Sequence, residues 1–403
     1  MNTPKIRFKG FTDDWEQRKL GEMVIDHNAG IYISKEDYGE GTNVIGVGNI
    51  YDRDIFDGEI YRLGPVNDDK FILEENDIIY GESSLVPEGI ARTVCVGKNG
   101  AGSAFAWHTR RVKLDKNIVN SHVATLELNY LHEIRKYLVS VSTQTALTGM
   151  TTEGYFGATL TLPSVEEQQV ISDYFKNIDY LITLHQRKCD ETKQLKKFML
   201  QKMFPKNGEK NPEIRFKGFT DDWEQRKVGE VTKELLDYDN FSSGLPLLTS
   251  SRSGLMYQSE YRGNATTENE NTLFSVVPLN ACTYRHMSDD STFHLNINTL
   301  EKGLVSKEYP VFQENESNLK FIVQYINSSN SFTKFCTEQK KGGTRTRLYY
   351  KTLCEYKLMM PSIKEQNKTA NFFDTLDHLI TLHQRKCEKL KELKKFMLQN
   401  MFV

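Results

Sequence analysis

Residues 164–204 read SVEEQQVISDYFKNIDYLITLHQRKCDETKQLKKFMLQKMF, and residues 362–402 read SIKEQNKTANFFDTLDHLITLHQRKCEKLKELKKFMLQNMF. The second stretch repeats the first 198 positions later, and 24 of the 41 aligned residues are identical. Neither copy contains Gly or Pro, and apolar residues return every three to four positions, the period of an amphipathic helix. Each copy therefore predicts a helix of about ten turns, roughly 60 Å long.

Both copies carry the same helix-start signal. Ser164 and Ser362 each follow a proline, and Glu167 and Glu365 come three residues later. A serine at the N-cap and a glutamate at N3 can bond reciprocally to the first backbone N–H groups as a capping box. The sequence therefore predicts that both long helices begin at these serines.

Helices of this length need a partner along their length, and the other copy is the obvious one. Duplicated sequence with similar connections at both ends favours an antiparallel, pseudo-twofold pair. The alternative is that each helix packs only on its neighbouring domain. An antiparallel pair would bring His185 near His383 and Cys189 near Cys387, as seam residues rather than as metal ligands.

A second repeat precedes each half of the chain. Residues 6–19, IRFKGFTDDWEQRK, return unchanged as residues 214–227. Asp13 and Glu16 resemble another capping box, so a short helix carrying Trp15 is predicted. The chain is thus a leader, a variable block and a long helix, repeated once. The predicted segments are 1–163, 164–204, a polar linker at 205–211, 212–361 and 362–403.

Bulk composition is that of an ordinary globular protein. The 403 residues carry a net charge of −2, with 26% charged residues, so nucleic-acid affinity would have to come from local basic patches. The six cysteines form no C-x-x-C pair, which argues against a zinc site or a disulfide framework. No apolar run reaches transmembrane length, and the N-terminal residues show no signal core. We expect a cytoplasmic protein without membrane contact.

Each variable block reads as mixed α and β structure in which strands prevail. In residues 22–162, β-rich runs alternate with turn signals, and a helix is predicted for Tyr130–Val141. The predicted strands of this block are Val44–Val47, Asp77–Tyr80, Ala91–Val96, Ser103–Trp107 and Val123–Leu128. In residues 230–360, strands are predicted for Leu245–Leu248, Leu273–Val277 and Tyr309–Phe312, with a helix for Leu319–Ile326. The two blocks are hard to align, so a copied frame holds diverged inserts.

Motifs for catalysis are weak. Gly46-Val47-Gly48 lacks the third glycine of a dinucleotide loop, and the sequence has no P-loop, no H-E-x-x-H and no G-x-S-x-G. It also has no N-P-P-aromatic tetrapeptide of the kind used by adenine methyltransferases. Two E-x-K fragments, at Glu191 and Glu338, have no well-placed partner aspartate. We therefore predict no catalytic residue in this chain.

The strongest local sign of DNA binding is residues 339–351, QKKGGTRTRLYYK, which contain five bases and no acid. Arginine is the usual reader of guanine in the major groove, and threonine hydroxyls can contact phosphates. The candidate contacts here are Lys340, Lys341, Thr344, Arg345, Thr346, Arg347, Tyr349 and Lys351. A solvated surface loop is the alternative.

The matching place in the first half, residues 142–154, reads STQTALTGMTTEG and contains no base. Hydroxyl and amide groups there could read base edges, and a plain loop is the equal alternative. The candidate contacts are Gln144, Thr145, Thr148 and Thr151. Further positive charge in the two blocks comes from Lys98 with Asn99, Arg110, Arg111, Arg252 and Arg285.

With these features assembled, the chain resembles the specificity subunit of type I restriction-modification systems. The matching features are the leader with Trp15, Leu20 and Gly21, the Pro-Ser-x-x-Glu-Gln helix starts, and two long helices that follow two divergent blocks. The resemblance spans essentially the whole chain. Val228 stands where leucine is usual, and the missing bases in 142–154 leave open which face of the first block touches DNA.

The resemblance implies an α+β fold with two target recognition domains, joined by two long helices in an antiparallel coiled coil. Each domain would read one half of a split double-stranded DNA site. The helices would set the gap and dock two modification subunits, which bind S-adenosylmethionine and methylate adenine. Restriction subunits, which use ATP and Mg²⁺, would join the complex, and no cofactor would bind this chain.

Two other classes of function stay open on the residues alone. The first is a coiled-coil adaptor whose two domains bind proteins or sugars. The second is a stand-alone nuclease or methyltransferase, which the missing motifs disfavour. A split DNA sequence enriched from a degenerate library would favour the specificity subunit, and activity of the chain alone would favour the enzyme.

Overall fold

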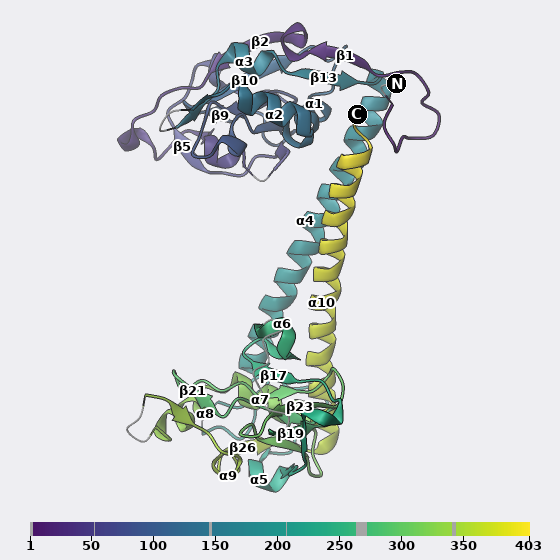
Figure 1. Cartoon of the computed structure of the whole chain (residues 1–403). Coiled ribbons are helices and arrows are strands. Elements are labelled where there is room, and N and C mark those ends of the chain that lie inside the picture. Colours follow the sequence, from purple (N-terminus) through teal and green to yellow (C-terminus); the bar gives the residue numbers. More distant parts are fainter. Residues whose placement is uncertain (1–2, 52, 145–146, 207, 263–271, 341–343) are drawn as a thin grey trace. The chain divides into compact units, whose positions relative to one another are not determined.

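The computed structural model describes residues 3–51, 53–144, 147–206, 208–262, 272–340 and 344–403. The chain divides into two compact units: Met1–Gln186 with Arg385–Val403, and Arg187–Gln384. The two predicted long helices are present as α4 (Val165–Lys202) and α10 (Ile363–Asn400), each of 38 residues (Figure 1). Both helices run from one unit into the other, so each unit contains a segment of each.

The helix starts are clamped by the copied leaders. The Ser164 hydroxyl accepts from the backbone N–H of Glu167 at 3.3 Å, as the capping box predicted. The reciprocal half of the box is wrong, because the Glu167 carboxylate binds Arg7 through two bonds of 2.8 and 2.7 Å. Glu365 binds Arg215 in the same way, at 2.6 and 2.8 Å. The planar guanidinium fork matches a carboxylate at two points, which a single backbone N–H cannot do.

In the first unit the segments of α4 and α10 lie side by side and run in opposite directions. The ammonium of Lys394 contacts the carboxylate of Asp179 at 2.7 Å. The Cys387 sulfur lies 4.0 Å from the carbonyl oxygen of Ile182. Residue numbers rise along α4 while they fall along α10, which defines an antiparallel contact.

The second unit repeats these contacts at positions shifted by 198. Lys196 contacts Asp377 at 2.7 Å, and the Cys189 sulfur lies 3.9 Å from the carbonyl oxygen of Ile380. Cys189 and Cys387 are both buried free thiols. The approach of these cysteines, and of His185 to His383, joins different units and stays a prediction.

The leaders form strands instead of the predicted short helix. β1 (Glu16–Lys19) pairs antiparallel with β13 (Thr159–Leu162), and β14 (Glu224–Lys227) pairs in the same way with β26 (Lys357–Met360). Each partner strand directly precedes a long helix, so pairing ties the leader to the helix start. The helix prediction around Trp15 was wrong because cross-strand bonding outweighed a local capping signal.

The main sheet of the first unit has the strand order β2-β10-β6-β8-β4. Its strands are β2 (Val24–Ala29), β4 (Ile55–Phe56), β6 (Ile78–Gly81), β8 (Thr93–Val96) and β10 (Thr109–Leu114). A second sheet has the order β5-β3-β9, with β3 (Thr42–Ile45), β5 (Arg62–Gly64) and β9 (Ala104–Phe105). The predicted strand at 77–80 is confirmed with a shift of one residue, and the strand predicted at 44–47 begins two residues earlier, at Thr42. Those predicted at 91–96 and 103–107 are shorter than expected. The helices are α1 (Ser121–Tyr130), α2 (His132–Ser140) and α3 (Thr152–Phe156).

The predicted strand at Val123–Leu128 is wrong, because these residues lie in α1. The Asn120 side chain caps this helix by accepting from the backbone N–H groups of His122 and Val123. Residues 121–129 of α1 are all buried. A helix buried on every side shows no amphipathic period, so its apolar run reads equally well as a buried strand.

The second unit has the strand order β15-β24-β20-β22. These strands are β15 (Thr232–Glu234), β20 (Cys282–Thr283), β22 (Asn296–Ile297) and β24 (Val311–Glu314). Beside them lie β16 (Tyr238–Asn240), β19 (Leu273–Val277) and β23 (Gly303–Ser306), and the hairpin of β17 (Leu248–Ser251) with β18 (Gly254–Tyr257). The helices are α5 (Val228–Val231), α6 (Gln258–Arg262), α7 (Leu319–Ser328), α8 (Asn330–Glu338) and α9 (Tyr350–Leu353). The strand at 273–277 and the helix at 319–326 are confirmed, while the strands predicted at 245–248 and 309–312 begin later.

The two units share one topology although their variable blocks could not be aligned by sequence. The order β2-β10-β6-β8 in the first corresponds to β15-β24-β20-β22 in the second. In each unit an asparagine caps the next helix and also donates its backbone N–H to the first glutamine of the adjacent long helix: Asn120 to Gln168 at 2.7 Å, and Asn318 to Gln366 at 2.9 Å. The main core of each unit includes side chains from both long helices. None of the described helices is long and apolar enough to cross a membrane.

Candidate nucleic-acid interface

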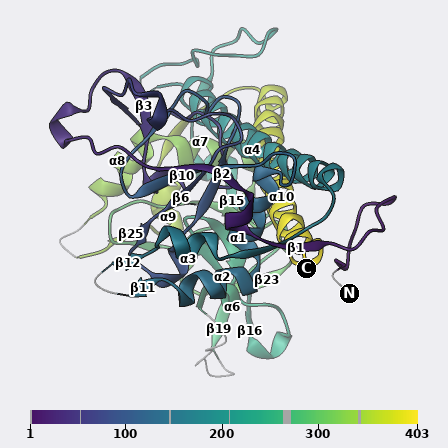
Figure 2. The same cartoon turned by 90° about the horizontal axis from the view of Figure 1, so that it is seen from above.

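A short strand ladder projects beyond the main sheet at the same place in both units. In the first unit, β12 (Thr148–Gly149) pairs with β7 (Ser83–Ser84). β11 (Thr143–Gln144) pairs with β12, and both strands are labelled in Figure 2. In the second unit, β25 (Thr346–Arg347) pairs with β21 (Met287–Ser288). Thr148 opposes Ser84, and Thr346 opposes Ser288.

The two ladders also share an equivalent backbone hydrogen bond. Met150 donates its N–H to the carbonyl of Glu82 at 2.9 Å, and Leu348 donates to His286 at 2.9 Å. Residues 150 and 348 are again 198 positions apart. The two loops matched by sequence, 142–154 and 339–351, therefore hold the same position in their units.

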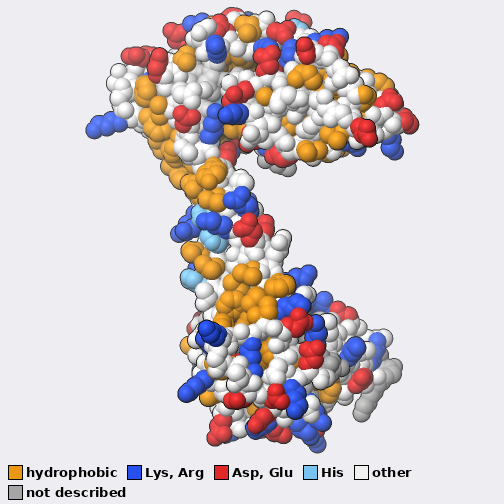
Figure 3. Space-filling view, turned by 180° about the vertical axis from the view of Figure 1, so that it is seen from behind, with side chains coloured by type: hydrophobic (Ala, Val, Ile, Leu, Met, Phe, Trp, Pro, Cys, Tyr) orange, Lys and Arg blue, Asp and Glu red, His pale blue; other side chains and the backbone are white. Residues whose placement is uncertain are grey.

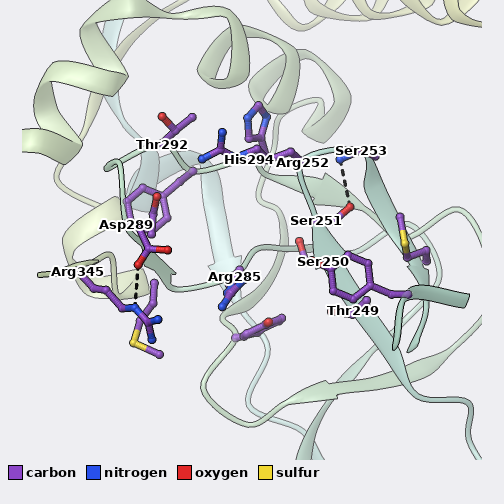
Figure 4. Close-up of a pocket in the computed structure, with 16 residues that line it drawn as sticks. Thr249, Ser250, Ser251, Arg252, Ser253, Arg285, Asp289, Thr292, His294 and Arg345 are labelled. Carbon is purple, nitrogen blue, oxygen red and sulfur yellow. Dashed lines mark hydrogen bonds and ion pairs between the residues drawn. The ribbon is translucent and has the colours of Figure 1, made fainter. Parts of the chain in front are cut away.

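In the second unit the ladder borders a hollow of about 440 Å³ lined by hydroxyl groups and arginines (Figure 4). Arg252 comes from the turn between β17 and β18, Arg285 follows β20, and Arg345 precedes β25. These three residues are distant in sequence, and the fold brings them to one surface. The hydroxyls of Thr249, Ser250, Ser251 and Thr292 also line the hollow.

Two aspartates that the sequence reasoning missed hold two of these arginines. Arg345 donates from Nε to Asp289 at 2.8 Å, and Arg252 pairs with Asp290. Bonds from the Ser288 hydroxyl and from Arg252 lower the pKa of Asp290, so it is ionised at neutral pH. Among the described residues no carboxylate pairs with Arg285. The signal that could have indicated the counter-ions was the acidic run at 289–290, between two β-rich stretches.

The other predicted contacts of residues 339–351 alternate between the surface and the interior. Thr346 is 1% exposed and its hydroxyl lies 2.6 Å from that of Ser291, so it shapes the ladder from inside. The Tyr349 ring, half exposed, stacks on His286 with 5.9 Å between ring centroids. Exposed positions are Lys340, Thr344, Arg347 and Lys351, while Lys341 lies outside the described residues.

The first unit gathers fewer polar groups at its ladder. Arg110 lies at the same end of the main sheet and pairs with Glu82, with both bonds at 2.8 Å. The Thr151 hydroxyl caps α3 by accepting from the N–H of Gly154 at 3.1 Å. Thr148 is buried, and Gln144 belongs to β11. The predicted contact Thr145 lies outside the described residues.

Three predicted contacts of the first unit lie elsewhere. Lys98 and Asn99 follow the opposite end of β8, because Tyr80 opposes Thr93 while Ile78 opposes Cys95 in the sheet register. Asn99 there donates its amide to Asp57 at 3.1 Å. Arg111 is 3% exposed and pairs with Asp26, so we leave it out of the proposed contact surface.

The surface carries charges of both signs (Figure 3). On the face drawn in Figure 3, Lys and Arg side chains are interspersed with Asp and Glu, without a broad basic field. Within the part of the chain that the structure describes, no group of three or more His, Cys, Asp or Glu side chains is placed to hold a metal ion. Arginines with carboxylate partners can exchange those partners for phosphates or base edges, which suits recognition of DNA.

Comparison with known proteins places these features in a family. The family model of the type I restriction modification DNA specificity domain matches residues 12–194 and 259–392, more than half of the chain. A similar solved structure is the S subunit of a type I restriction-modification system from M. genitalium, with TM-score 0.62, 13% identity, and coverage of 100% of this chain and 99% of that one. The HsdS subunit from Thermoanaerobacter tengcongensis matches with TM-score 0.45 and 14% identity over 96% of each chain. With both domain-sized segments matched by that model, the chain belongs to the type I restriction-modification DNA specificity family, whose role is recognition of DNA sequence.

Proposed function

We propose that this chain is the specificity subunit of a type I restriction-modification complex and reads a split double-stranded DNA site, with one half-site for each unit. The observation that carries the proposal is the repeated ladder. One strand pair and the backbone hydrogen bond beside it are equivalent in both units, whereas the side chains around them differ. Two copies of one frame with different side chains are what a protein needs in order to read two different half-sites.

The hollow of the second unit supports base reading by arginine. Arg285 lies among hydroxyl groups without a carboxylate partner in the described residues, and its fork can bond two acceptors of a guanine edge. Arg252 and Arg345 are each held by one aspartate, so DNA would have to displace that partner. Such an exchange suits contacts with phosphates, which position the duplex and weaken as salt rises.

Docking of two modification subunits is supported by apolar side chains on the long helices. Leu195 and Phe198 of α4 are 46% and 49% exposed, and their repeat equivalents on α10, Leu393 and Phe396, are 41% and 52% exposed. Exposed leucine and phenylalanine in two equivalent pairs fit two copies of one partner. We propose that the helices act as an antiparallel coiled coil that carries these docks, with restriction subunits joining the complex afterwards.

The chemistry of the complex would lie outside this chain. S-adenosylmethionine would bind the modification subunits, and ATP with Mg²⁺ would bind the restriction subunits. We propose no catalytic group in this chain, in line with a family that is generally non-catalytic. The chain alone should therefore leave methyl transfer at background.

A selection experiment tests the function directly. The full chain is purified with its modification subunits, and the complex is mixed with a degenerate duplex library. We expect one split sequence to be enriched, and native mass spectrometry to show two modification subunits per chain. An adaptor with two protein- or sugar-binding domains would enrich no DNA sequence, and that outcome would reject the proposal. Methyl transfer by the chain alone would point instead to the enzyme alternative.

A further inference from the structure

The tips of the two equivalent ladders carry opposite chemistry. The strand pairing ends at Thr148 opposite Ser84 in the first unit and at Thr346 opposite Ser288 in the second. The next residues outward in the first unit are Leu147 and Leu85. In the second unit they are Arg345 and Asp289, which form an ion pair of 2.8 Å.

The apolar tip of the first unit is unusually accessible. The side chain of Leu85 is 87% exposed, Val86 is 54% exposed and Leu147 is 46% exposed. Single exposed apolar residues are ordinary on protein surfaces, but three at the tip of one small ladder form a patch. The loop that carries Leu85 is held in shape, because the Ser84 hydroxyl accepts from the backbone N–H of Val86 at 3.3 Å and lies 3.3 Å from the Tyr51 hydroxyl.

The equivalent position in the second unit points to the ligand of the Leu85 patch. Its counterpart in the second unit borders the arginine-lined hollow, and the family match covers the first-unit ladder within residues 12–194. In its unit the tip therefore holds the position that borders the proposed DNA-contacting hollow of the second unit. The apolar feature that a base pair offers in the major groove is the 5-methyl group of thymine.

We infer that Leu85, with Val86 and Leu147 beside it, is a specificity determinant of the first unit that reads a thymine methyl group in its half-site. At the equivalent place the second unit carries Arg345, which suits contact with a phosphate. This inference rests on the proposed function, and it explains how residues 142–154 can belong to a reader although they contain no base. A methyl contact is worth about a fourfold change in affinity, since burying one CH₂ group contributes roughly 0.8 kcal/mol.

The test uses the full chain assembled with its modification subunits and the enriched duplex. The half-site of the first unit is the one whose selected sequence is unchanged by Arg285→Ala in the second unit. Each thymine of that half-site is then replaced by deoxyuridine, which lacks only the methyl group. We expect at least one replacement to weaken binding about fourfold. In the Leu85→Ser variant we expect the same replacement to have no further effect, because the contact is already lost.

Ile60→Ser is the matched control, because Ile60 is 77% exposed in the same unit but lies outside the ladder. It should keep the sensitivity to deoxyuridine. An enriched site that is insensitive to deoxyuridine at every thymine would overturn the inference while leaving the proposed function intact. Equal weakening of all sequences by Leu85→Ser would also overturn it, since that result indicates a wedge between base steps. If no split site is enriched, the proposed function fails and the inference fails with it.

Discussion

At the scale of single residues, Glu127 is a carboxyl group that the first unit buries completely. This side chain is wholly buried in α1, where one carboxylate oxygen accepts from the backbone N–H of Thr161 at 2.9 Å. Among the residues that the structure describes, the other oxygen has no hydrogen-bond partner. Burial raises the pKa of Glu127 to about 8, and the single bond from Thr161 offsets only part of that shift. Glu127 is therefore protonated at neutral pH in the folded chain.

The raised pKa of Glu127 fixes the sign of a pH effect on stability. The unfolded chain ionises this group near its ordinary value of 4.5, so its contribution to stability is complete below that pH. The contribution is then lost as pH rises from about 4.5 through about 8, at roughly 1.4 kcal/mol per pH unit. We expect Glu127→Gln to remove this loss, so that the melting temperature of the first unit falls less between pH 5 and pH 8.5. Differential scanning calorimetry across that range measures the difference.

Glu133→Gln provides the control for this experiment, because Glu133 is exposed in α2. Its melting temperatures should follow those of the unchanged chain at every pH. Parallel pH curves for Glu127→Gln and the unchanged chain would show that Glu127 is ionised in the fold.

At the scale of elements, the same helix contact has different surroundings in the two units. In the first unit, Lys394 contacts both Asp179 and Asp54, at 2.7 and 2.6 Å. Asp54 is 1% exposed and also accepts from Tyr130 and Asn129. This network ties α10 to the variable block of the first unit. In the second unit, the equivalent Lys196 pairs with Asp377, and both side chains are partly exposed.

Removal of the two lysines should therefore have unequal costs. Lys394→Met leaves the buried Asp54 without its counter-charge, and breaking such a pair costs about 3–5 kcal/mol. Lys196→Met breaks a partly exposed pair, worth at most about 1 kcal/mol. Hydrogen exchange of helix peptides, compared between the two matched variants, should show faster exchange in the first unit for Lys394→Met and little change for Lys196→Met. Similar acceleration in both units would mean that Asp54 adds nothing to the helix contact.

At the scale of the whole molecule, the repeated segments were predictable and the surroundings of the site were not. The helical period of residues 164–204 and their copy needed no tertiary information, because an amphipathic pattern without Gly or Pro is local. The strand at residues 16–19 could not be foreseen, because its partner at 159–162 is more than 140 positions away. Arg252, Arg285 and Arg345 could be named individually as bases. Their convergence depends on a topology that the diverged blocks conceal, and so does the pairing of Arg345 with Asp289.

The duplication also means that half of the chain contains both members of each repeated helix contact. Residues 1–204 include both Asp179 and Lys196. In the intact chain, Asp179 contacts Lys394, which is the repeat equivalent of Lys196. Lys196 contacts Asp377, which is the repeat equivalent of Asp179. In two copies of this half, each Asp179 can face the Lys196 of the other copy. We expect residues 1–204 to form a homodimer in sedimentation velocity. Asp179→Lys should weaken it, and Asp179→Lys with Lys196→Asp should restore it; a monomeric half chain would contradict the equivalence.

Such a homodimer would change the symmetry of the DNA site that the protein recognises. If the intact chain reads a split site as proposed, its two different ladders on one repeated frame would select two half-sites of different sequence. Two identical halves related by a twofold axis would instead require an inverted repeat, because the symmetry of a dimer is mirrored in its target. Under the proposed function, the internal duplication would therefore free this protein from palindromic targets, and exchange of one variable block would create a new asymmetric target.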